Sequence, residues 1–253
     1  MARREGNPTE VLPASGRAGK DAAAVQAMFD RVAPRYDLVN TVVSLGQDAH
    51  WRRVAARAAA PGGARVLDVA AGTGGLSRAL CDHGATGVVA LDLSYRMLAA
   101  GRGRQAPLVR LINGDALRLP FPAACFDAVT IAFGLRNLPD QEAGLREFAR
   151  VTRPGGRLVV LEFSTPTWRP FRVAYQAYLA HGLPRIADVL AASPAAYRYL
   201  SESILLWPDQ ETLAGWIATT GWEQVSYRNL AGGIVAVHRA RRRSPPGDGT
   251  STR

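Results

Sequence analysis

The hydrophobic positions along the chain follow two periods that alternate in a regular order. Short apolar runs typical of buried strands are separated by stretches with apolar residues three and four apart, as in amphipathic helices. Continuous apolar strands between helices predict a parallel sheet covered on both faces, which binds ligands at the carboxyl ends of its strands. The predicted strands are Arg65–Val69, Gly87–Asp92, Leu108–Asn113, Phe126–Ile131 and Arg157–Phe163, and the helices between them are Leu76–His83, Tyr95–Gly103 and Gln141–Arg153.

The last of these helices is expected to end at Pro154, Gly155 and Gly156, because neither proline nor glycine continues a helix well. Beyond Ser164 the alternation is lost. The pattern then predicts two helical segments and two further strands, which are close enough in sequence to pair as an antiparallel hairpin. The helical segments are 166–192 and 209–220, and the strands are 222–229 and 234–240. The predicted fold is therefore a doubly wound α/β sheet of seven strands.

Both ends of the chain differ in composition from the rest. Residues 1–20 and 244–253 are rich in glycine, proline, arginine and small polar residues, so we expect two disordered tails. Between them, residues 21–243 are predicted to form one domain, with a helical cap at residues 21–60 and an insert at residues 166–207.

The composition excludes several functions. The 253 residues are 47% hydrophobic and carry a formal charge of +10, which suits a globular domain with one core. No run approaches the roughly 20 apolar residues of a membrane span, and no signal peptide is recognisable, so a cytoplasmic protein is expected. All basic residues but Lys20 are arginines and they are scattered, which argues against nucleic acid and favours weak attraction to an anionic membrane surface. The two cysteines and four histidines have no metal-ligand spacing.

A glycine-rich turn follows the first predicted strand. Gly72, Thr73, Gly74 and Gly75 stand before a helix, where backbone N–H groups can hold a polar or anionic ligand. The dinucleotide fingerprint Gly-x-Gly-x-x-Gly fails at its last position, which is Ser77, so a pyrophosphate ligand is disfavoured.

Acidic residues at the ends of three consecutive strands favour a different cofactor. Asp68, Asp92 and Asp115 could meet the cationic and hydroxyl groups of S-adenosylmethionine, and Asp92, twenty residues beyond Gly72, suits the ribose hydroxyls. These carboxylates would repel a pyrophosphate. The alternative is that the aspartates only cap the helices and turns that follow them.

The sequence resembles class I S-adenosylmethionine-dependent methyltransferases, in particular the C-methyltransferase family of menaquinone and ubiquinone biosynthesis, over about residues 27–238. The resemblance implies a seven-stranded sheet with an antiparallel last strand. It is carried by Met28-Phe29-Asp30-Arg31-Val32-Ala33, Arg35-Tyr36-Asp37, Asn40, Ser44-x-Gly46, Trp51-Arg52, residues 67–74, Leu119-Pro120-Phe121, Phe133-Gly134-Leu135-Arg136-Asn137, residues 153–157, Leu161-Glu162-Phe163-Ser164, Tyr197-Arg198-Tyr199-Leu200, Ser203-Ile204, Gly232-Gly233-Ile234-Val235-Ala236 and His238.

Carried over position by position, the resemblance implies that Thr73, Asp92, Asp115 and Ala116 contact S-adenosylmethionine. Asp68, the turn residues Gly72 and Gly74, and Ala132, which falls on a further contact position of the family, complete the expected cofactor set. Two positions depart from the family. Ala132 stands where a serine is usual, which would lose a hydrogen bond of about 0.5 to 1.5 kcal/mol, and Asp48 stands where histidine is frequent.

The family reaction methylates a ring carbon of a polyprenyl quinol, converting demethylmenaquinol to menaquinol. The carbon becomes nucleophilic when the neighbouring phenol loses its proton, so a cation that stabilises the naphtholate promotes the reaction. We expect Arg136 to supply that charge, Asn137 to hold the other ring oxygen and Tyr36 to flank the cofactor. The alternative for Arg136 is a structural ion pair with a carboxylate such as Asp140.

Four aromatic residues predict a further surface. Trp168, Phe171, Tyr175 and Tyr178 share one helical face, which suits core packing or contact with a lipophilic substrate. A long prenyl tail exceeds what the domain can enclose, so we expect the tail to stay in the membrane and the protein to associate with it peripherally. His181 could line the substrate cavity, and a homodimer is left open.

Rival functions remain at this level. A paralogue could methylate a ubiquinone precursor or a phenolic or polyketide ring, and a non-catalytic module could bind the cofactor or RNA without turnover. Amino-group methylation is disfavoured because residues 132–135 lack the Asn/Asp-Pro-Pro-aromatic motif, and a cysteine-dependent mechanism because Cys125 does not follow a proline.

Overall fold

The computed structural model describes residues 22–33, 36–44, 46–60, 62–183, 185 and 194–244, so the predicted tails lie outside the described residues apart from Ser244. Seven strands form one sheet in the order β3-β2-β1-β4-β5-β7-β6. Their bounds are β1 Arg65–Val69, β2 Gly87–Asp92, β3 Val109–Asn113, β4 Phe126–Ala132, β5 Thr152–Phe163, β6 Trp222–Leu230 and β7 Val235–Arg242. The strands β1 to β5 run parallel, and β7 lies antiparallel between β5 and β6. The predicted fold class is confirmed.

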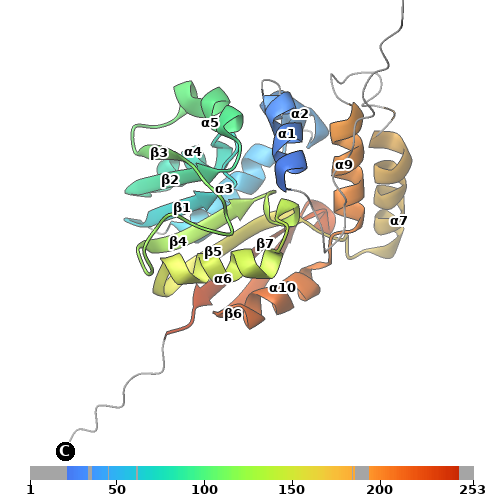
Figure 1. Ribbon diagram of the computed structural model, residues 1–253. Coiled ribbons are helices and arrows are strands. Elements are labelled where there is room, and N and C mark those ends of the chain that lie inside the picture. The colour runs from blue at the N-terminus through green and yellow to red at the C-terminus, as the bar shows by residue number, and fades with distance from the viewer. Residues whose placement is uncertain are drawn as a thin grey trace, which may run out of the picture.

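Helices cover both faces of the sheet (Figure 1). Those within the described residues are α1 Ala22–Val32, α2 Tyr36–Val43, α3 Asp48–Ala59, α4 Gly75–Asp82, α5 Tyr95–Gly101, α6 Gln141–Val151, α7 Arg169–Ala177, α9 Pro194–Leu205 and α10 Gln210–Thr219. In Figure 1, α1 and α2 lie above the carboxyl ends of the strands, and α7 and α9 stand beside them at the edge of the molecule.

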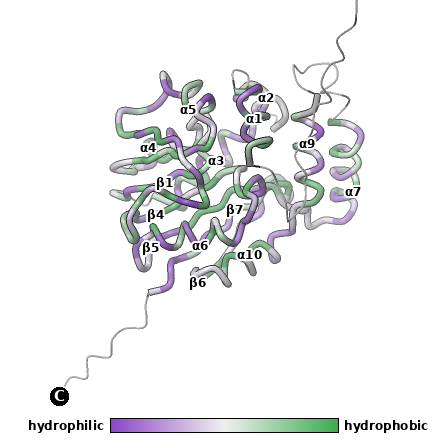
Figure 2. Tube along the Cα trace, viewed as in Figure 1, coloured by the Kyte–Doolittle hydropathy of each residue, from purple (hydrophilic) through white to green (hydrophobic). Residues whose placement is uncertain are grey.

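The side chains of β1 alternate between two clusters of the hydrophobic core, one on each face of the sheet. Leu67 and Val69 belong to the cluster that packs against α6 and α10, whereas Val66 belongs to the cluster formed with α3 and α4. Since successive side chains of a strand point to opposite faces, Asp68 lies on the α3 and α4 side. Figure 2 shows the hydrophobic segments running along the central strands.

Several predicted boundaries shift by one or two residues, and the largest difference lies between α6 and β5. The helix α6 ends at Val151 and not at Arg153, and β5 begins at Thr152. Thr152 has extended backbone angles and its hydroxyl donates to the carbonyl of Phe148 at 2.7 Å, which closes the helix before the proline is reached. Residues 154–156 therefore lie inside β5, where the register against β4 shifts.

The predicted helical segment at residues 166–192 begins later than expected, at Arg169. It is represented by α7, which continues into one π-helical turn at Tyr178–Gly182. Residues 186–193 lie outside the described part of the chain.

Candidate active site

The glycine turn after β1 packs closely against its neighbours. Gly72 and Gly74 have φ angles of +58° and +77°, which glycine adopts without steric cost. A Cβ atom on Gly72 would lie 3.2 Å from the Cε of Met97 and 3.8 Å from the ring of Tyr36. A side chain at either position would therefore be strained, and one at Gly72 would crowd Met97.

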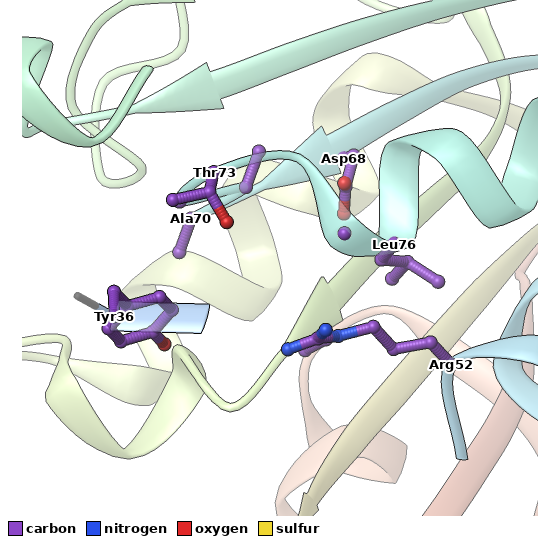
Figure 3. Close-up of a pocket in the computed structure, with 10 residues that line it drawn as sticks. Tyr36, Arg52, Asp68, Ala70, Thr73 and Leu76 are labelled. Atoms are coloured by element: carbon purple, nitrogen blue, oxygen red, sulfur yellow. The ribbon is translucent and has the colours of Figure 1, made fainter. Parts of the chain in front are cut away.

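A small open cavity lies beside this turn (Figure 3). Its lining brings together several predicted residues with one that sequence reasoning did not single out, Arg52. The lining residues are Tyr36, Arg52, Asp68, Ala70, Ala71, Gly72, Thr73, Gly75, Leu76 and Ala132. Figure 3 shows the Tyr36 ring and the Arg52 guanidinium on the opposite side of this space from Asp68 and Thr73. The cavity thus stands where β1 and β4 end, as the fold predicts.

Asp68 is almost fully buried, and both its oxygens accept hydrogen bonds. Ser77 donates to one at 2.6 Å and Thr130 donates to the other at 2.9 Å. Burial raises the pKa of Asp68 to about 6, against the opposing effect of these hydroxyls and of the Arg52 charge. The residue that breaks the dinucleotide fingerprint, Ser77, therefore has a defined purpose, because it holds the carboxylate at the cavity wall.

Asp92 fastens the glycine turn to the next strand. Its carboxylate accepts the backbone N–H of Gly72 at 2.7 Å and that of Ser94 at 2.8 Å, and burial raises its pKa. The capping alternative thus describes part of what Asp92 does. A carboxylate offers about four acceptor positions, so these two bonds still allow the ribose contact expected from the sequence.

The third predicted acid, Asp115, is exposed and lies away from the cavity lining. It follows β3, whose last residue Asn113 pairs with Asp92, and its side chain accepts the N–H of Leu117 at 2.9 Å. The adjoining Ala116 is buried. Asp92, Asp115 and Ala116 thus lie at the carboxyl ends of β2 and β3, next to the cavity at the end of β1.

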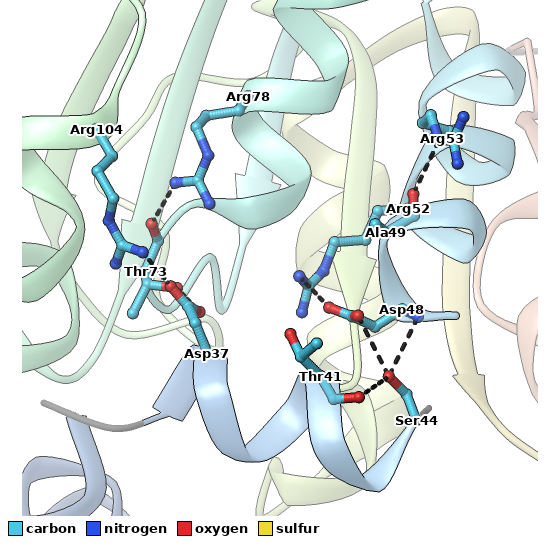
Figure 4. A network of polar contacts seen from close by, with 10 residues as sticks. All are labelled: Asp37, Thr41, Ser44, Asp48, Ala49, Arg52, Arg53, Thr73, Arg78 and Arg104. Carbon is cyan, nitrogen blue, oxygen red and sulfur yellow. Dashed lines mark hydrogen bonds and ion pairs between the residues drawn. The ribbon is translucent and has the colours of Figure 1, made fainter. Parts of the chain in front are cut away.

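The helical cap is tied to the glycine turn by Asp37 of α2. Its carboxylate accepts the Thr73 hydroxyl at 2.5 Å and pairs with Arg104 at 2.6 Å (Figure 4). Burial alone would raise the pKa of Asp37, but these two partners lower it below its usual value. Thr73, a predicted cofactor contact, therefore uses its hydroxyl to hold α2 over the turn. Asp37 was visible in the sequence only as part of a motif.

Arg136 stands just beyond β4 in a short 3-10 helix, and it is buried. Its guanidinium lies 2.8 Å from Glu162 of β5, donates to the carbonyl of Phe133 at 2.7 Å and sits over the ring of Phe163 at 5.0 Å. Asp140, the partner considered from sequence, instead caps α6 by accepting the N–H of Ala143. The structural ion pair exists, but with a residue at the end of the neighbouring strand.

Asn137 is held by an aromatic residue from α9. Its side-chain oxygen accepts the hydroxyl of Tyr199 at 3.0 Å, and its amide nitrogen donates to the carbonyl of Phe133 at 3.3 Å. Sequence reasoning missed Tyr199, although it lies in a quoted motif. The contact joins α9 to the segment that carries Arg136 and Asn137.

The cavity beside the glycine turn adjoins the segment that carries Arg136 and Asn137. A Cβ on Gly134 would lie 2.5 Å from the Cβ of Ala70, so the turn after β4 rests directly on the turn after β1. Ala70 and Ala132 line the cavity, and the carbonyl of Phe133 accepts from both Arg136 and Asn137. A ligand in the cavity and a second molecule near Arg136 would therefore meet across Ala132 and Phe133.

The aromatic face of α7 is partly packed and partly exposed. No residue of this helix is buried, Trp168 and Val173 are 68% and 60% exposed, and Tyr178 is partly exposed. Tyr175, however, packs against the cluster of Leu179, Leu183 and Ile204, and the ring of Phe171 lies against Gly232. Core packing therefore describes one part of this face and exposure the other. His181 is exposed on the π-helical turn.

Comparison with known proteins identifies the family. Residues 17–242 match the model of the ubiE/COQ5 methyltransferase family. The chain belongs to this family. It is 56% identical over 217 residues to a demethylmenaquinone methyltransferase of Renibacterium salmoninarum, covering 85% of this chain and 91% of the relative. It is 58% identical over 222 residues to a protein of the same name from Mycobacterium sp. strain KMS, covering 87% and 95%.

Solved structures show the same fold at lower identity. A possible histamine N-methyltransferase of Thermotoga maritima matches with a TM-score of 0.61 at 18% identity, covering 85% of this chain and 98% of that one. The phosphoethanolamine N-methyltransferase 2 of Haemonchus contortus, solved in complex with S-adenosylmethionine, matches with a TM-score of 0.53 at 15% identity, covering 72% and 49%. The predicted class I methyltransferase fold is thereby confirmed.

The protein is thus an S-adenosylmethionine-dependent methyltransferase, as the resemblance implied. The cavity fits that cofactor in its donor set, since it combines a glycine turn without side chains, the buried carboxylate of Asp68 and a nearby edge that carries Asp92. Within the described residues, none of the helices is long and apolar enough to cross a bilayer.

Proposed function

We propose that this chain transfers a methyl group from S-adenosylmethionine to a ring carbon of demethylmenaquinol and so forms menaquinol. The observation that carries the proposal is the name shared by relatives that are 56 to 58% identical over most of their length. The geometry supports it, because the buried Arg136 lies in the short helix that follows β4, and the last residue of β4, Ala132, lines the cofactor cavity. Demethylmenaquinol is a lipophilic polyprenyl naphthoquinol, and its ring must reach that guanidinium.

When bound, the cofactor supplies a methyl group on a positively charged sulfur. We propose that Asp92 accepts the ribose hydroxyls, that Asp115 and Ala116 flank the adenine, and that Tyr36 closes the cavity over the glycine turn. Asp68 presents negative charge at the wall of β1, where it favours the cationic part of the cofactor.

Arg136 is our candidate for activating the quinol. Its positively charged guanidinium stabilises the oxyanion of the naphtholate and so increases the electron density on the neighbouring carbon. Glu162 fixes the position of the guanidinium. Both side chains are buried, and charges interact more strongly in the protein interior than in water. The amide group of Asn137 has two N–H donors, and we assign the one not directed at Phe133 to the other ring oxygen.

The α7 surface supports peripheral association with the inner face of an anionic membrane. We propose this surface as the docking site. It is formed by the exposed residues Trp168 and Val173, together with Leu206, which directly follows α9 in the sequence. Arginines on the same segments supply matching positive charge, namely Arg169, Arg172, Arg185 and Arg198. The prenyl tail would then remain in the bilayer while the ring enters beneath α9.

The deciding experiment incubates the purified protein with methyl-labelled S-adenosylmethionine and a panel of reduced quinones and phenols. We expect label on a ring carbon of demethylmenaquinol. Transfer only to a ubiquinone precursor or to another phenolic ring would overturn the substrate while keeping the enzyme class.

A further inference from the structure

Arg52 has a place in the cofactor cavity that the family assignment does not explain. It projects from α3 and its side chain is 15% exposed. A Cβ on Gly75 would lie 2.6 Å from its Nη1 atom, so the guanidinium rests against the first residue of α4. Among the described residues that line the cavity, it is the one with a cationic side chain.

The charge of the cofactor calls for such a residue. S-adenosylmethionine carries two positive groups, the sulfonium and the ammonium, and one negative group, the carboxylate. Asp68 and Asp92 suit the positive groups and the ribose, but a carboxylate beside them would be repelled. A guanidinium matches carboxylate geometry with paired N–H donors.

The strand order places Arg52 at the correct end. Asp115 follows β3 and Asp92 ends β2, so the adenosine part lies over that side of the sheet. The amino-acid part must then extend toward β1 and β4. The helix α3 packs on α4, β4 and β5, which brings Arg52 to the amino-acid end.

Asp48 holds Arg52 in this position. Its carboxylate lies 2.9 Å from Nη1 of Arg52 and accepts the Ser44 hydroxyl at 3.2 Å, while Ser44 accepts the backbone N–H of Asp48 at 3.3 Å (Figure 4). Asp48 itself is buried. Arginine has five N–H donors, and the described residues engage one of Arg52's through Asp48, which orients the side chain and leaves capacity for a ligand.

We propose that Arg52 binds the carboxylate of the methionine part of S-adenosylmethionine and that Asp48 is its positioning residue. The proposal rests on the cofactor assignment and names the contact that distinguishes the amino-acid end of the ligand. It also makes the product, S-adenosylhomocysteine, a ligand of Arg52, because the product keeps the same carboxylate.

The test compares two ligands that differ only in this group, S-adenosylmethionine and its decarboxylated form, by calorimetry on the full chain. We expect the unaltered protein to prefer S-adenosylmethionine by roughly 10- to 100-fold, the range for a charge-assisted hydrogen-bonded pair. Arg52→Met should remove this preference by weakening S-adenosylmethionine alone. Arg53→Met, which removes the same charge from the exposed neighbouring residue, should leave both affinities unchanged.

The decarboxylated ligand separates a lost contact from a damaged fold. If Arg52→Met weakens both ligands by the same factor, or weakens neither, the assignment of Arg52 is overturned. If the unaltered protein binds neither ligand, the cofactor assignment itself fails, whatever Arg52 does.

Asp48 is tested with the same pair. Asp48→Ala should weaken S-adenosylmethionine selectively and by less than Arg52→Met, and Asp48→Asn should restore most of the affinity because its amide oxygen still accepts from Arg52. Equal weakening of both ligands by Asp48→Ala, or no rescue by Asp48→Asn, would overturn the positioning role.

Discussion

The guanidinium of Arg136 lies 2.8 Å from the carboxylate of Glu162, and both side chains are at most 5% exposed. Glu162 also accepts the backbone N–H of Arg136 at 3.3 Å and that of Phe163 at 2.9 Å. The ends of β4 and β5 are therefore joined through one carboxylate, which sets the position of the charge proposed to activate the quinol.

Replacing Glu162 with Ala should destabilise the protein by about 3 to 5 kcal/mol, the usual cost of removing one partner of a buried ion pair. Urea denaturation measures the change. Glu162→Gln keeps the acceptor oxygen and should cost less, while its rate of methyl transfer falls because the guanidinium is held less firmly. Equal stability of Glu162→Ala and the unaltered chain would show that the pair contributes nothing to the fold.

Arg136→Lys keeps the charge but loses the planar fork. We expect methyl transfer to fall by about 100-fold or more, as for other groups that stabilise a developing oxyanion, with the affinity for S-adenosylmethionine unchanged. Calorimetry and single-turnover rates separate the two effects. A variant that transfers methyl at the original rate would remove Arg136 from the chemistry.

Asp68→Asn should make the protein more stable at neutral pH. The native state raises the pKa of Asp68 from 3.8 to about 6, so between these values the folded protein binds the proton more tightly than the unfolded chain. Stability therefore falls as the pH rises through this window, and the variant escapes that loss. We expect a gain of about 2 to 3 kcal/mol at pH 8 that disappears below about pH 4.

Urea denaturation between pH 4 and 8 measures this gain. The same substitution should weaken S-adenosylmethionine binding, because the cavity loses a negative charge. A gain in stability that is the same at pH 4 and pH 8 would contradict the titration of Asp68.

Gly101→Ala should disturb the glycine turn from outside. A Cβ there would lie 2.2 Å from the carbonyl oxygen of Thr73, a backbone atom that cannot rotate away. Overpacking of this kind costs about 1 to 3 kcal/mol, and the shifted turn should bind S-adenosylmethionine more weakly. Gly103→Ala is the matched control, since nothing lies within 4 Å of its added Cβ. The idea fails if the two variants behave alike.

The proposed membrane surface predicts a selective loss of vesicle binding. The unaltered protein should float with anionic vesicles that carry demethylmenaquinol, and Trp168→Ser with Val173→Ser should reduce its recovery. Leu108→Ser removes a comparable exposed apolar residue beside β3 and should leave recovery unchanged. Equal recovery of the unaltered protein with and without vesicles would contradict membrane docking. If the double variant instead loses a dimer in light scattering while its vesicle binding is intact, the surface is a subunit interface.

Strands and helices were predictable because strands buried on both faces form continuous apolar runs, whereas the helices that cover them repeat apolar residues every three or four positions. The strands β1 and β2 agree residue by residue with the prediction. The end of α6 was not predictable from Pro154, since the stop comes from the hydroxyl of Thr152 bonding back to the helix. Such a local bond has no signature in the periodicity.

The edge of the sheet that carries the candidate site was predictable from the aspartates at the strand ends. The hydrogen-bond and ion-pair partners of the site residues were not predictable. Nothing in the spacing indicated that Thr73 would bond Asp37, or that Glu162 would hold Arg136. These contacts join segments 36 and 26 residues apart, and only the strand order brings them together. Arg52 was overlooked for the same reason, because it reaches the cavity from a helix that precedes the sheet.

The exposure of α7 has a consequence for how the family can diverge. Its exposed positions, such as Trp168 and Val173, contribute little packing to the fold, so substitutions there carry little thermodynamic risk. Natural variation or laboratory evolution of this one helix could therefore adapt the enzyme to differently shaped hydrophobic acceptors while the catalytic framework stays untouched.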